Sequence, residues 1–241
     1  MATKPKTGTN IVSVAETLKA QVATMAERTA PPTGAAIRVT QDKHFLMPDG
    51  VKTQGPIQLV IVDFTSKNTF YEGAFDAKNI TPPACFSIGD VVDKMVPSAN
   101  SPDVQSADCK SCTMNQFGSA GTGKACKNTR TLAVLPPDAT ASSPLWLLST
   151  SPTANKGFDA FVTSVIRTFQ VPPVGVIVTV GFDENETYAK LVFSDPVPNP
   201  RVAEFLGRQE EARSMLVVEP DVSKYVAKPA PTQRGKVTTR R

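Results

Sequence analysis

The sequence predicts a β-dominated α+β fold, most simply a small curled antiparallel barrel with one or more helices packed against it. Two observations indicate this class. Short apolar segments typical of strands occur in neighbouring pairs separated by polar turns, as in residues 174–193. Helical periodicity is confined to a few segments, of which 156–170 is the clearest. Strands joined by short turns pair antiparallel, so we expect a mostly antiparallel sheet.

Charge is distributed unevenly along the chain. The 241 residues include 26 Lys and Arg against 22 Asp and Glu, a net charge of +4. Residues 222–241 hold six basic side chains and no acidic one, so removing them leaves −2 for the rest. The basic balance therefore belongs to a tail and says little about nucleic-acid binding by the body of the protein.

Neither a membrane span nor a secretory signal is recognisable. The longest apolar runs, 59–62 and 174–180, are far shorter than the roughly 20 residues that a spanning helix needs. Residues 1–10 contain lysines but lack the apolar stretch of a signal peptide. We expect a soluble, cytoplasmic protein that has no membrane partner.

The two ends of the chain differ from its middle. Residues 1–35 form a predicted N-terminal arm, in which apolar residues spaced three or four apart between 10 and 30 indicate an amphipathic helix. Residues 36–200 form the predicted core, and 201–219 a C-terminal helix. The Pro-rich, basic segment 220–241 is expected to be disordered.

The core contains a predicted β-hairpin near its start. Residues 57–64 (IQLVIVDF) form a nearly continuous β-branched run, which suits a buried strand. Residues 68–75 follow a short polar turn at 65–67, so we expect them to be the hairpin partner. Two further strand-like segments, 131–135 and 145–149, come after a long polar loop.

The second half of the core alternates helix and hairpin. Residues 156–170 carry one wide apolar stripe, with Asn155 as the expected N-cap and a Pro-Pro pair beyond the end. Residues 174–182 and 187–193 predict a second hairpin. A short helix, 201–214, then opens after a proline.

All four cysteines lie in the polar loop 82–130. They are Cys85, Cys109, Cys112 and Cys126, with the spacing C-x23-C-x2-C-x13-C. A C-x2-C pair lets two thiolates reach one ion, and two more cysteines complete a tetrahedron. Metal binding would order a segment that has no apolar core, because the free energy of binding is then free energy of folding. We therefore expect a structural Zn²⁺ site.

Three other roles for the cysteines stay open. Four Cys thiolates also hold iron–sulfur clusters, which we consider the next alternative. Two disulfides would need an oxidising compartment, and the absence of a recognisable signal argues against one. Free cysteines can also be inert residues. His44, the only histidine, is expected to be an ordinary surface or half-buried residue.

The same loop contains residues 118–124 (GSAGTGK), which match part of a phosphate-binding P-loop. Ala125 stands where a Ser or Thr would bind Mg²⁺, and no predicted strand directly precedes the motif. The motif also lies between two cysteines. We expect its glycines to allow a tight turn back to Cys126.

No catalytic constellation is recognisable. A single histidine cannot supply the usual acid–base arrangements, and no Ser/His/Asp or Cys/His set is present. The acidic residues are scattered, apart from a predicted solvated turn at 183–186. We therefore expect a binding protein, neither an enzyme nor a binder of a small-molecule substrate.

Candidate contacts for a polyanion occur in two groups. Cations in or just after the cysteine loop are Lys110, Lys124, Lys127 and Arg130. Aromatic and basic side chains alternate in the second group, which is Lys67, Phe70, Tyr71 and Lys78. In sequence-tolerant binding of single strands, bases stack on rings and cations hold phosphates. Adjacent residues of a strand face opposite ways, and we expect Tyr71 to be the exposed ring.

Several segments resemble phage-encoded single-stranded DNA-binding or DNA-replication accessory proteins. They are 59–64 (LVIVDF), the cysteine-containing 70–87 and 105–135, and the later 148–162 and 178–194. The resemblance covers roughly residues 37–200, and its cysteine-containing part is the most specific.

The resemblance implies an OB-like antiparallel barrel with an inserted metal-binding loop, in which the four cysteines are the ligands. It also implies sequence-tolerant binding of single-stranded DNA in replication or recombination, in the cytoplasm of a host, with other replication proteins as further partners. Two features depart from the family: the tail is basic instead of acidic, and no histidine lies in the loop. The rival interpretation is a structural or interaction protein of a phage virion or replication complex, with no dedicated oligonucleotide site.

Overall fold

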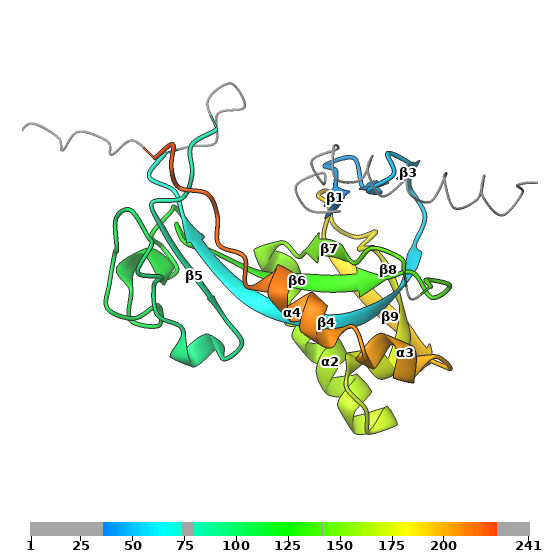
Figure 1. Cartoon of the computed structure of the whole chain (residues 1–241). Helices are drawn as coiled ribbons and strands as arrows, with labels where there is room; N and C mark the ends of the chain where they lie inside the picture. The colour runs from blue at the N-terminus through cyan, green and yellow to red at the C-terminus, as the bar shows by residue number, and fades with distance from the viewer. Residues whose placement is uncertain (1–35, 74–79, 141, 226–241) are drawn as a thin grey trace, which may run out of the picture.

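One long strand, β4 (Ile57–Phe70), runs through the middle of the computed structural model. The model describes residues 36–73, 80–140 and 142–225, and within these residues nine strands form one sheet. The sheet curls into a half-barrel with helices packed on both of its faces (Figure 1). The predicted β-dominated α+β class is therefore confirmed.

The other elements are short. The strands are β1 (Ala36–Val39), β2 (Phe45–Leu46), β3 (Lys52–Thr53), β5 (Cys85–Gly89), β6 (Lys127–Leu135), β7 (Trp146–Ser149), β8 (Val176–Phe182) and β9 (Leu191–Pro198). The helices are α2 (Asn155–Phe169), α3 (Val202–Leu206) and α4 (Gln209–Leu216). Single 3-10 turns occur at η1 (Val92–Lys94), η2 (Thr113–Asn115), η3 (Pro152–Ala154) and η4 (Pro173–Gly175).

The sheet is mostly antiparallel, as predicted, and one parallel strand pair makes it mixed. The strand order is β3-β2-β1-β7-β6-β4-β8-β9, with β5 paired to the far end of β4. Strand β1 runs parallel to β7, with Ala36 opposite Leu147. The antiparallel expectation applies to strands joined by short turns, and these two strands are remote in the chain. Within the described residues the ladder ends at β3 and β9, so the half-barrel is open.

The predicted hairpin 57–64/68–75 is wrong, because β4 continues straight through the expected turn. Its far half, from Ser66 to Phe70, pairs with β5 on one side and with β6 on the other. Ser66 and Asn68 of this half are buried, and Asn128 Nδ2 donates to Asn68 Oδ1 at 2.6 Å. This polar segment is therefore a central strand and not a turn. The register of β4 with β6 shifts between Ile61 and Asp63.

The second predicted hairpin and the main helix are confirmed. Strands β8 and β9 pair antiparallel, and α2 matches the predicted helix closely. The N-cap is wrong, because the cap position is Ala154 and the Asn155 amide instead donates to the backbone oxygen of Asn128 at 2.9 Å. The helix ends at Gln170, which has a left-handed φ of 56°.

The C-terminal helix predicted for 201–219 is two helices. Helix α3 ends at Gly207, and α4 begins at Gln209. At the break, the Arg208 guanidinium donates to the backbone oxygen of Ser143 at 3.0 Å. The predicted N-terminal arm, 1–35, and residues 226–241 of the predicted tail lie outside the described residues.

The buried apolar side chains of the described residues form two clusters, one on each face of the sheet. Leu59 and Ile61 of β4 face α2, where they join Phe158. Val60 and Val62 face the other way and pack against α3 and α4. Because both faces are covered, the first half of β4 is continuously apolar, as strands buried on both sides are.

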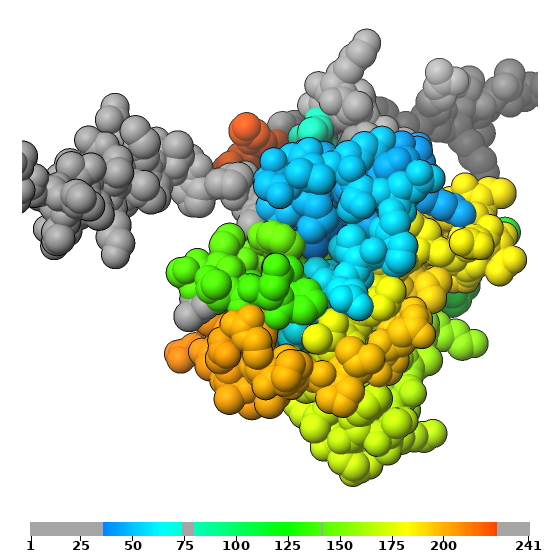
Figure 2. All heavy atoms as spheres, turned by 90° about the vertical axis from the view of Figure 1, so that its right-hand side faces the viewer, coloured from blue at the N-terminus to red at the C-terminus, as the bar shows by residue number. Residues whose placement is uncertain are grey.

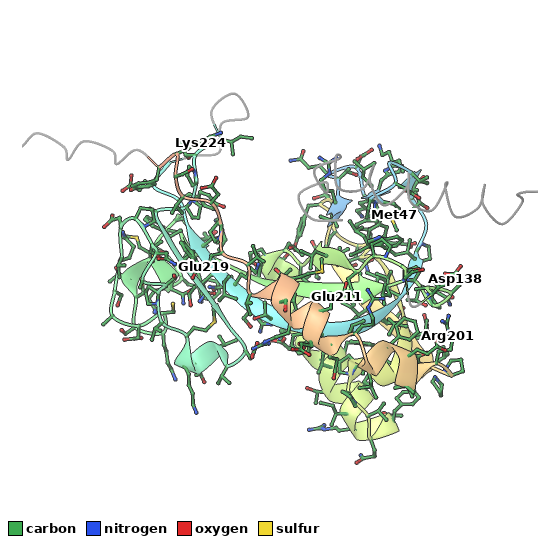
Figure 3. The ribbon with its side chains drawn as sticks, in the orientation of Figure 1. Met47, Asp138, Arg201, Glu211, Glu219 and Lys224 are labelled. Atoms are coloured by element: carbon green, nitrogen blue, oxygen red, sulfur yellow. The ribbon has the colours of Figure 1, made fainter. Side chains whose placement is uncertain are left out.

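Residues 80–126, which we call the cysteine lobe, are carried by the far ends of β4 and β6. Strand β5 attaches the lobe to β4, with Cys85 opposite Phe70. The segment after α4 contacts the other side of the lobe, where Glu219 lies (Figure 3). Ser98 Oγ and Asn100 Nδ2 donate to the Glu219 carboxylate, each at 2.6 Å. The lobe is therefore held both by the sheet and by the segment after α4.

Away from the cysteine lobe, β1–β3 lie beside the β8–β9 region (Figure 2). Lys43 makes the connection, since its ammonium donates to the backbone oxygens of Asp183 at 2.9 Å and of Glu186 at 2.6 Å. The acidic turn 183–186 is thus bonded to the body, while its Glu184 and Asn185 remain exposed.

Candidate metal centre and nucleic-acid interface

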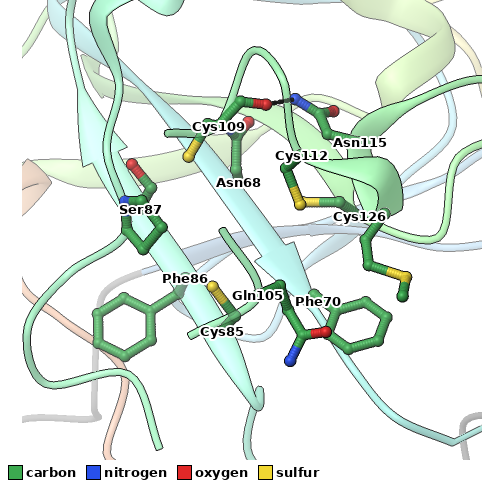
Figure 4. A pocket seen from close by; sticks show the side chains of 12 residues that line it. Asn68, Phe70, Cys85, Phe86, Ser87, Gln105, Cys109, Cys112, Asn115 and Cys126 are labelled. Atoms are coloured by element: carbon green, nitrogen blue, oxygen red, sulfur yellow. Dashed lines mark hydrogen bonds between the residues drawn. The ribbon is translucent and has the colours of Figure 1, made fainter. Parts of the chain in front are cut away.

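The four cysteines line one cavity of the cysteine lobe. Cys85 lies on β5, Cys109 and Cys112 lie on the loop that follows, and Cys126 directly precedes β6 (Figure 4). All four are free thiols. In the described part of the chain, no three His, Cys, Asp or Glu side chains are placed closely enough to hold one ion. The thiols therefore surround the cavity without converging on one point.

Backbone hydrogen bonds position the cysteines. The N–H of Cys109 donates to Met95 at 3.0 Å, and the N–H of Cys126 donates to Met114 at 2.8 Å. The Asn115 amide donates to the backbone oxygen of Cys109 at 2.6 Å. Polar contacts of the backbone and of amide side chains thus do much of the ordering in this lobe.

The cysteines share one electrostatic environment. The pKa of the Cys126 thiol is raised to about 12, first by burial and then by the charges of Cys109, Cys112 and Cys85. A cation among the four sulfurs would favour the thiolates, because it supplies the charge that burial and mutual repulsion oppose.

The donor chemistry suits a single soft ion, although the thiols as placed do not converge on one point. The donors are four thiols, the set that structural zinc sites use. The cavity between them has a volume of about 20 Å³, which is space for about one water-sized sphere. An iron–sulfur cluster contains several iron and sulfide atoms, so its bulk fits this space less well.

The glycine-rich segment 118–124 makes a tight turn. The N–H groups of Gly118 and Ala120 both donate to the backbone oxygen of Gly123, at 3.0 and 3.2 Å. Gly118 and Gly121 have φ values of 92° and 61°, which favour glycine. The expected tight turn toward Cys126 is present, and neither the strand before it nor the helix after it that a P-loop needs is found among the described residues.

The predicted lysines of the cysteine lobe lie on its surface. Lys110 pairs with Asp93 at 3.4 Å. The Lys124 ammonium lies 5.0 Å from the centre of the Phe117 ring and 3.4 Å from Asn115 Oδ1. Lys127 is exposed, and its ammonium donates to the backbone oxygen of Lys124 at 3.1 Å.

The predicted residues of β4 separate into two environments. Phe70 lines the cysteine cavity, so its ring faces the candidate metal centre. Tyr71 is 43% exposed, as expected of the outward ring. Lys67 lines a different hollow, and burial lowers the pKa of its ammonium. Lys78 lies outside the described residues.

Arg130 is not on the surface, and this corrects its predicted contact with DNA. The residue is 9% exposed, and its guanidinium donates to both carboxylate oxygens of Asp159 on α2. A guanidinium that is buried and bidentate with a carboxylate is not offered to a phosphate.

A broad groove of about 1060 Å³ lies against the sheet, and the sequence did not predict it. Its walls come from β1, from the far halves of β4 and β6, from β7, and from the turn before β9. Its described lining includes the cations Arg38 and Lys67, the ring of Tyr188, eight Ser and Thr hydroxyls, and no carboxylate.

Several groove side chains are available to a ligand. Arg38 is exposed and has no ion pair or hydrogen-bonded side chain within the described residues. Tyr188 is 43% exposed. The hydroxyls of Thr69, Ser149 and Thr187 are likewise without hydrogen-bond partners in the described ranges. The groove therefore offers cationic and hydroxyl donors together with one aromatic face.

The predicted Lys127 lies on the same face as this groove. Lys127 is opposite Thr69 in the β4–β6 ladder, and Thr129 is opposite Lys67. Side chains directly opposite each other in an antiparallel pair share a face. The sequence contains a pattern that could have predicted this polar face. Hydroxyl and basic residues occupy every second position of 65–69 and 127–131, which is the period of a strand.

The described helices include none that is both long and apolar enough to cross a membrane. No protein-family model matches the chain, and no curated protein or solved structure matches it either.

Proposed function

We propose that the protein binds single-stranded DNA without strong sequence preference, through the broad groove, and acts in DNA replication or recombination. The observation that carries this proposal is the chemistry of the groove lining: cations and hydroxyls without a carboxylate among the described residues. Such a lining suits a phosphate backbone, since lysine, arginine and hydroxyl side chains supply most phosphate contacts.

The shape of the groove favours a single strand. It is broad and crosses several strands of a curled sheet, as in OB-like domains, where the concave side of a small β-barrel receives one strand. Tyr188 and Tyr71 are exposed rings on which bases could stack. The sheet differs from a closed antiparallel barrel, because it is open and one of its strand pairs is parallel. We therefore propose the relationship to OB-like domains from the curl of the sheet and the groove alone.

A structural zinc ion in the cysteine lobe forms the second half of the proposal. Cys85, Cys109, Cys112 and Cys126 would hold it, and it would order a lobe whose own apolar core is small. With four protein ligands the ion would have no open position, so it would contribute stability and no chemistry. The lobe would in turn hold Lys124 and Lys127 at one end of the groove.

Fluorescence anisotropy with a labelled oligo-dT tests the binding. We expect the affinity to fall linearly with salt on logarithmic axes, because phosphate contacts release counterions. Arg38→Gln should weaken binding and reduce the magnitude of the salt slope by about 1. The matched control is Arg167→Gln, an exposed arginine on α2, on the other side of the sheet. Failure of the wild type to bind at about 50 mM salt would reject the proposal.

The rival interpretation is a structural or interaction protein without an oligonucleotide site. In such a protein the basic tail alone could bind DNA non-specifically. Residues 226–241 contain five basic side chains and no acidic one. Deleting them should lower the affinity moderately and leave the Arg38→Gln effect in place. If all affinity leaves with the tail, the groove is not an oligonucleotide site, and the rival interpretation is favoured.

A further inference from the structure

Phe117 is the most exposed large apolar side chain of the described residues, at 79%. It lies in the cysteine lobe, between the 3-10 turn η2 and the glycine turn at 118–123. A ring this exposed forgoes the free energy that burial would provide, and it needs a reason to stay outside. Single exposed apolar residues are common, so exposure alone does not indicate a binding site, and the surroundings of the ring decide.

The chain on both sides of Phe117 is held in place. Before it, the Gln116 amide donates to the backbone oxygens of Lys110 at 2.8 Å and of Cys112 at 3.2 Å. After it, Ser119 Oγ donates to the backbone oxygens of Gln116 and Met114, at 2.7 and 2.9 Å. The ring is thus presented on an ordered loop, which lowers the entropic cost of binding a flat ligand.

A cation lies against the ring. The Lys124 ammonium lies 5.0 Å from the ring centre, within the range of a cation–π contact. No acidic residue occurs between Cys109 and Pro137 in the sequence. An aromatic face beside a lysine suits a nucleotide, whose base can stack while its phosphate meets the ammonium.

The ring is also continuous with the groove. Lys127 shares a face with Lys67 and Thr69, which line the groove. The ammonium of Lys127 donates to the backbone oxygen of Lys124, and Lys124 in turn lies against Phe117. A line of cations therefore leads from the groove onto the cysteine lobe.

We infer that Phe117 is a base-stacking platform of the cysteine lobe, which takes an unpaired base of the strand that leaves the groove past Lys127 and Lys124. This inference rests on the proposed function and identifies a contact beyond the groove. Loss of stacking should lower the affinity for a strand with bases by about 5-fold to 150-fold.

The test compares two probes, a labelled oligo-dT and an abasic oligonucleotide of the same length. Phe117→Leu, which keeps apolar bulk and removes the ring face, should weaken binding of oligo-dT and leave abasic binding unchanged. Phe117→Trp should restore the affinity and give a fluorescence change on binding. Ile166→Ala, at a 50% exposed apolar residue on α2, is the control and should bind as the wild type does.

Each outcome separates this inference from the proposed function. If the wild type binds oligo-dT and Phe117→Leu binds it equally well, the platform is rejected and the groove stands. If Phe117→Leu loses affinity for both probes alike, the ring acts by positioning Lys124, and stacking is rejected. If the wild type binds neither probe, both proposals fail. Equal melting temperatures of the variants and the wild type show that the lobe remains folded.

Discussion

The guanidinium of Arg130 on β6 donates two hydrogen bonds to the carboxylate of Asp159 on α2, at 3.2 and 2.9 Å. The arginine side chain is 11% exposed and the aspartate 51%. The pair therefore joins the far half of the sheet to the main helix, at the point where the apolar core ends. Its charges serve the fold, although the sequence places Arg130 among basic residues suited to DNA.

We expect Asp159→Asn to lower the free energy of unfolding by about 1–2 kcal/mol, because a largely buried guanidinium loses its charged partner while the exposed side of the pair limits the cost. Urea denaturation measures this change. Arg167→Gln, on the exposed face of the same helix, should change stability by less than about 0.5 kcal/mol. A clear loss of DNA affinity in a folded Asp159→Asn protein would contradict the structural role of the pair.

Phe158 is the centre of the larger apolar cluster. It is fully buried and meets Phe64 and Phe193 edge to face, with ring centres 5.0 and 5.1 Å away. We expect Phe158→Ala to cost about 3–5 kcal/mol, since it removes a buried ring and leaves a cavity. Phe158→Leu should cost clearly less. Equal stability of the alanine variant and the wild type in urea would show that α2 does not pack as described.

The cysteine cavity predicts about one zinc ion per chain by elemental analysis. Cys112→Ser should lower both the metal content and the melting temperature, because the lobe loses a ligand that is also buried. Thr113→Ala, at the exposed position directly after Cys112, should change neither. Visible absorbance from iron would favour a cluster instead, and an unchanged melting temperature in Cys112→Ser would show that the metal does not order the lobe.

Acid should loosen the contact between α4 and the cysteine lobe. The Arg213 guanidinium pairs with Asp90, and this hydrogen bond is the largest factor that lowers the pKa of the Asp90 carboxyl below its ordinary 3.8. The native state thus favours the carboxylate, so the stabilisation is present above pH 3.8 and is lost as the pH falls through the lowered native pKa.

The matching variant is Asp90→Asn. Both partners are more than 40% exposed, so solvent screens the pair and we expect a loss of at most about 1 kcal/mol near neutral pH. In urea titrations at pH about 7 and about 3, the difference between wild type and variant should shrink at the lower pH. A difference that grows on acidification would contradict this assignment.

Much of the fold could be predicted from local patterns. The stripe of 156–170 and the hairpin formed by 174–182 and 187–193 correspond to α2 and to β8 with β9. Their apolar spacing depends on burial of one face, which recurs within a few residues. The polar segment 65–67 lacks such apolar spacing and is therefore predicted as a turn. This prediction fails because β5 and β6 pair with the segment, and local composition does not show which distant strands will pair.

The sequence by itself determined the strand-rich class, the main helix and the cysteine loop, because each depends on residue types at short spacings. Only the tertiary structure decided what surrounds them. The groove arises where β1 joins β7, more than a hundred residues away, and where the β4–β6 register places Lys67 and Lys127 on one face. Arg130 is likewise buried because it pairs with Asp159 on α2, a helix that follows it in the chain. Such pairings depend on which distant segments meet, and single-sequence periodicity carries no information about that.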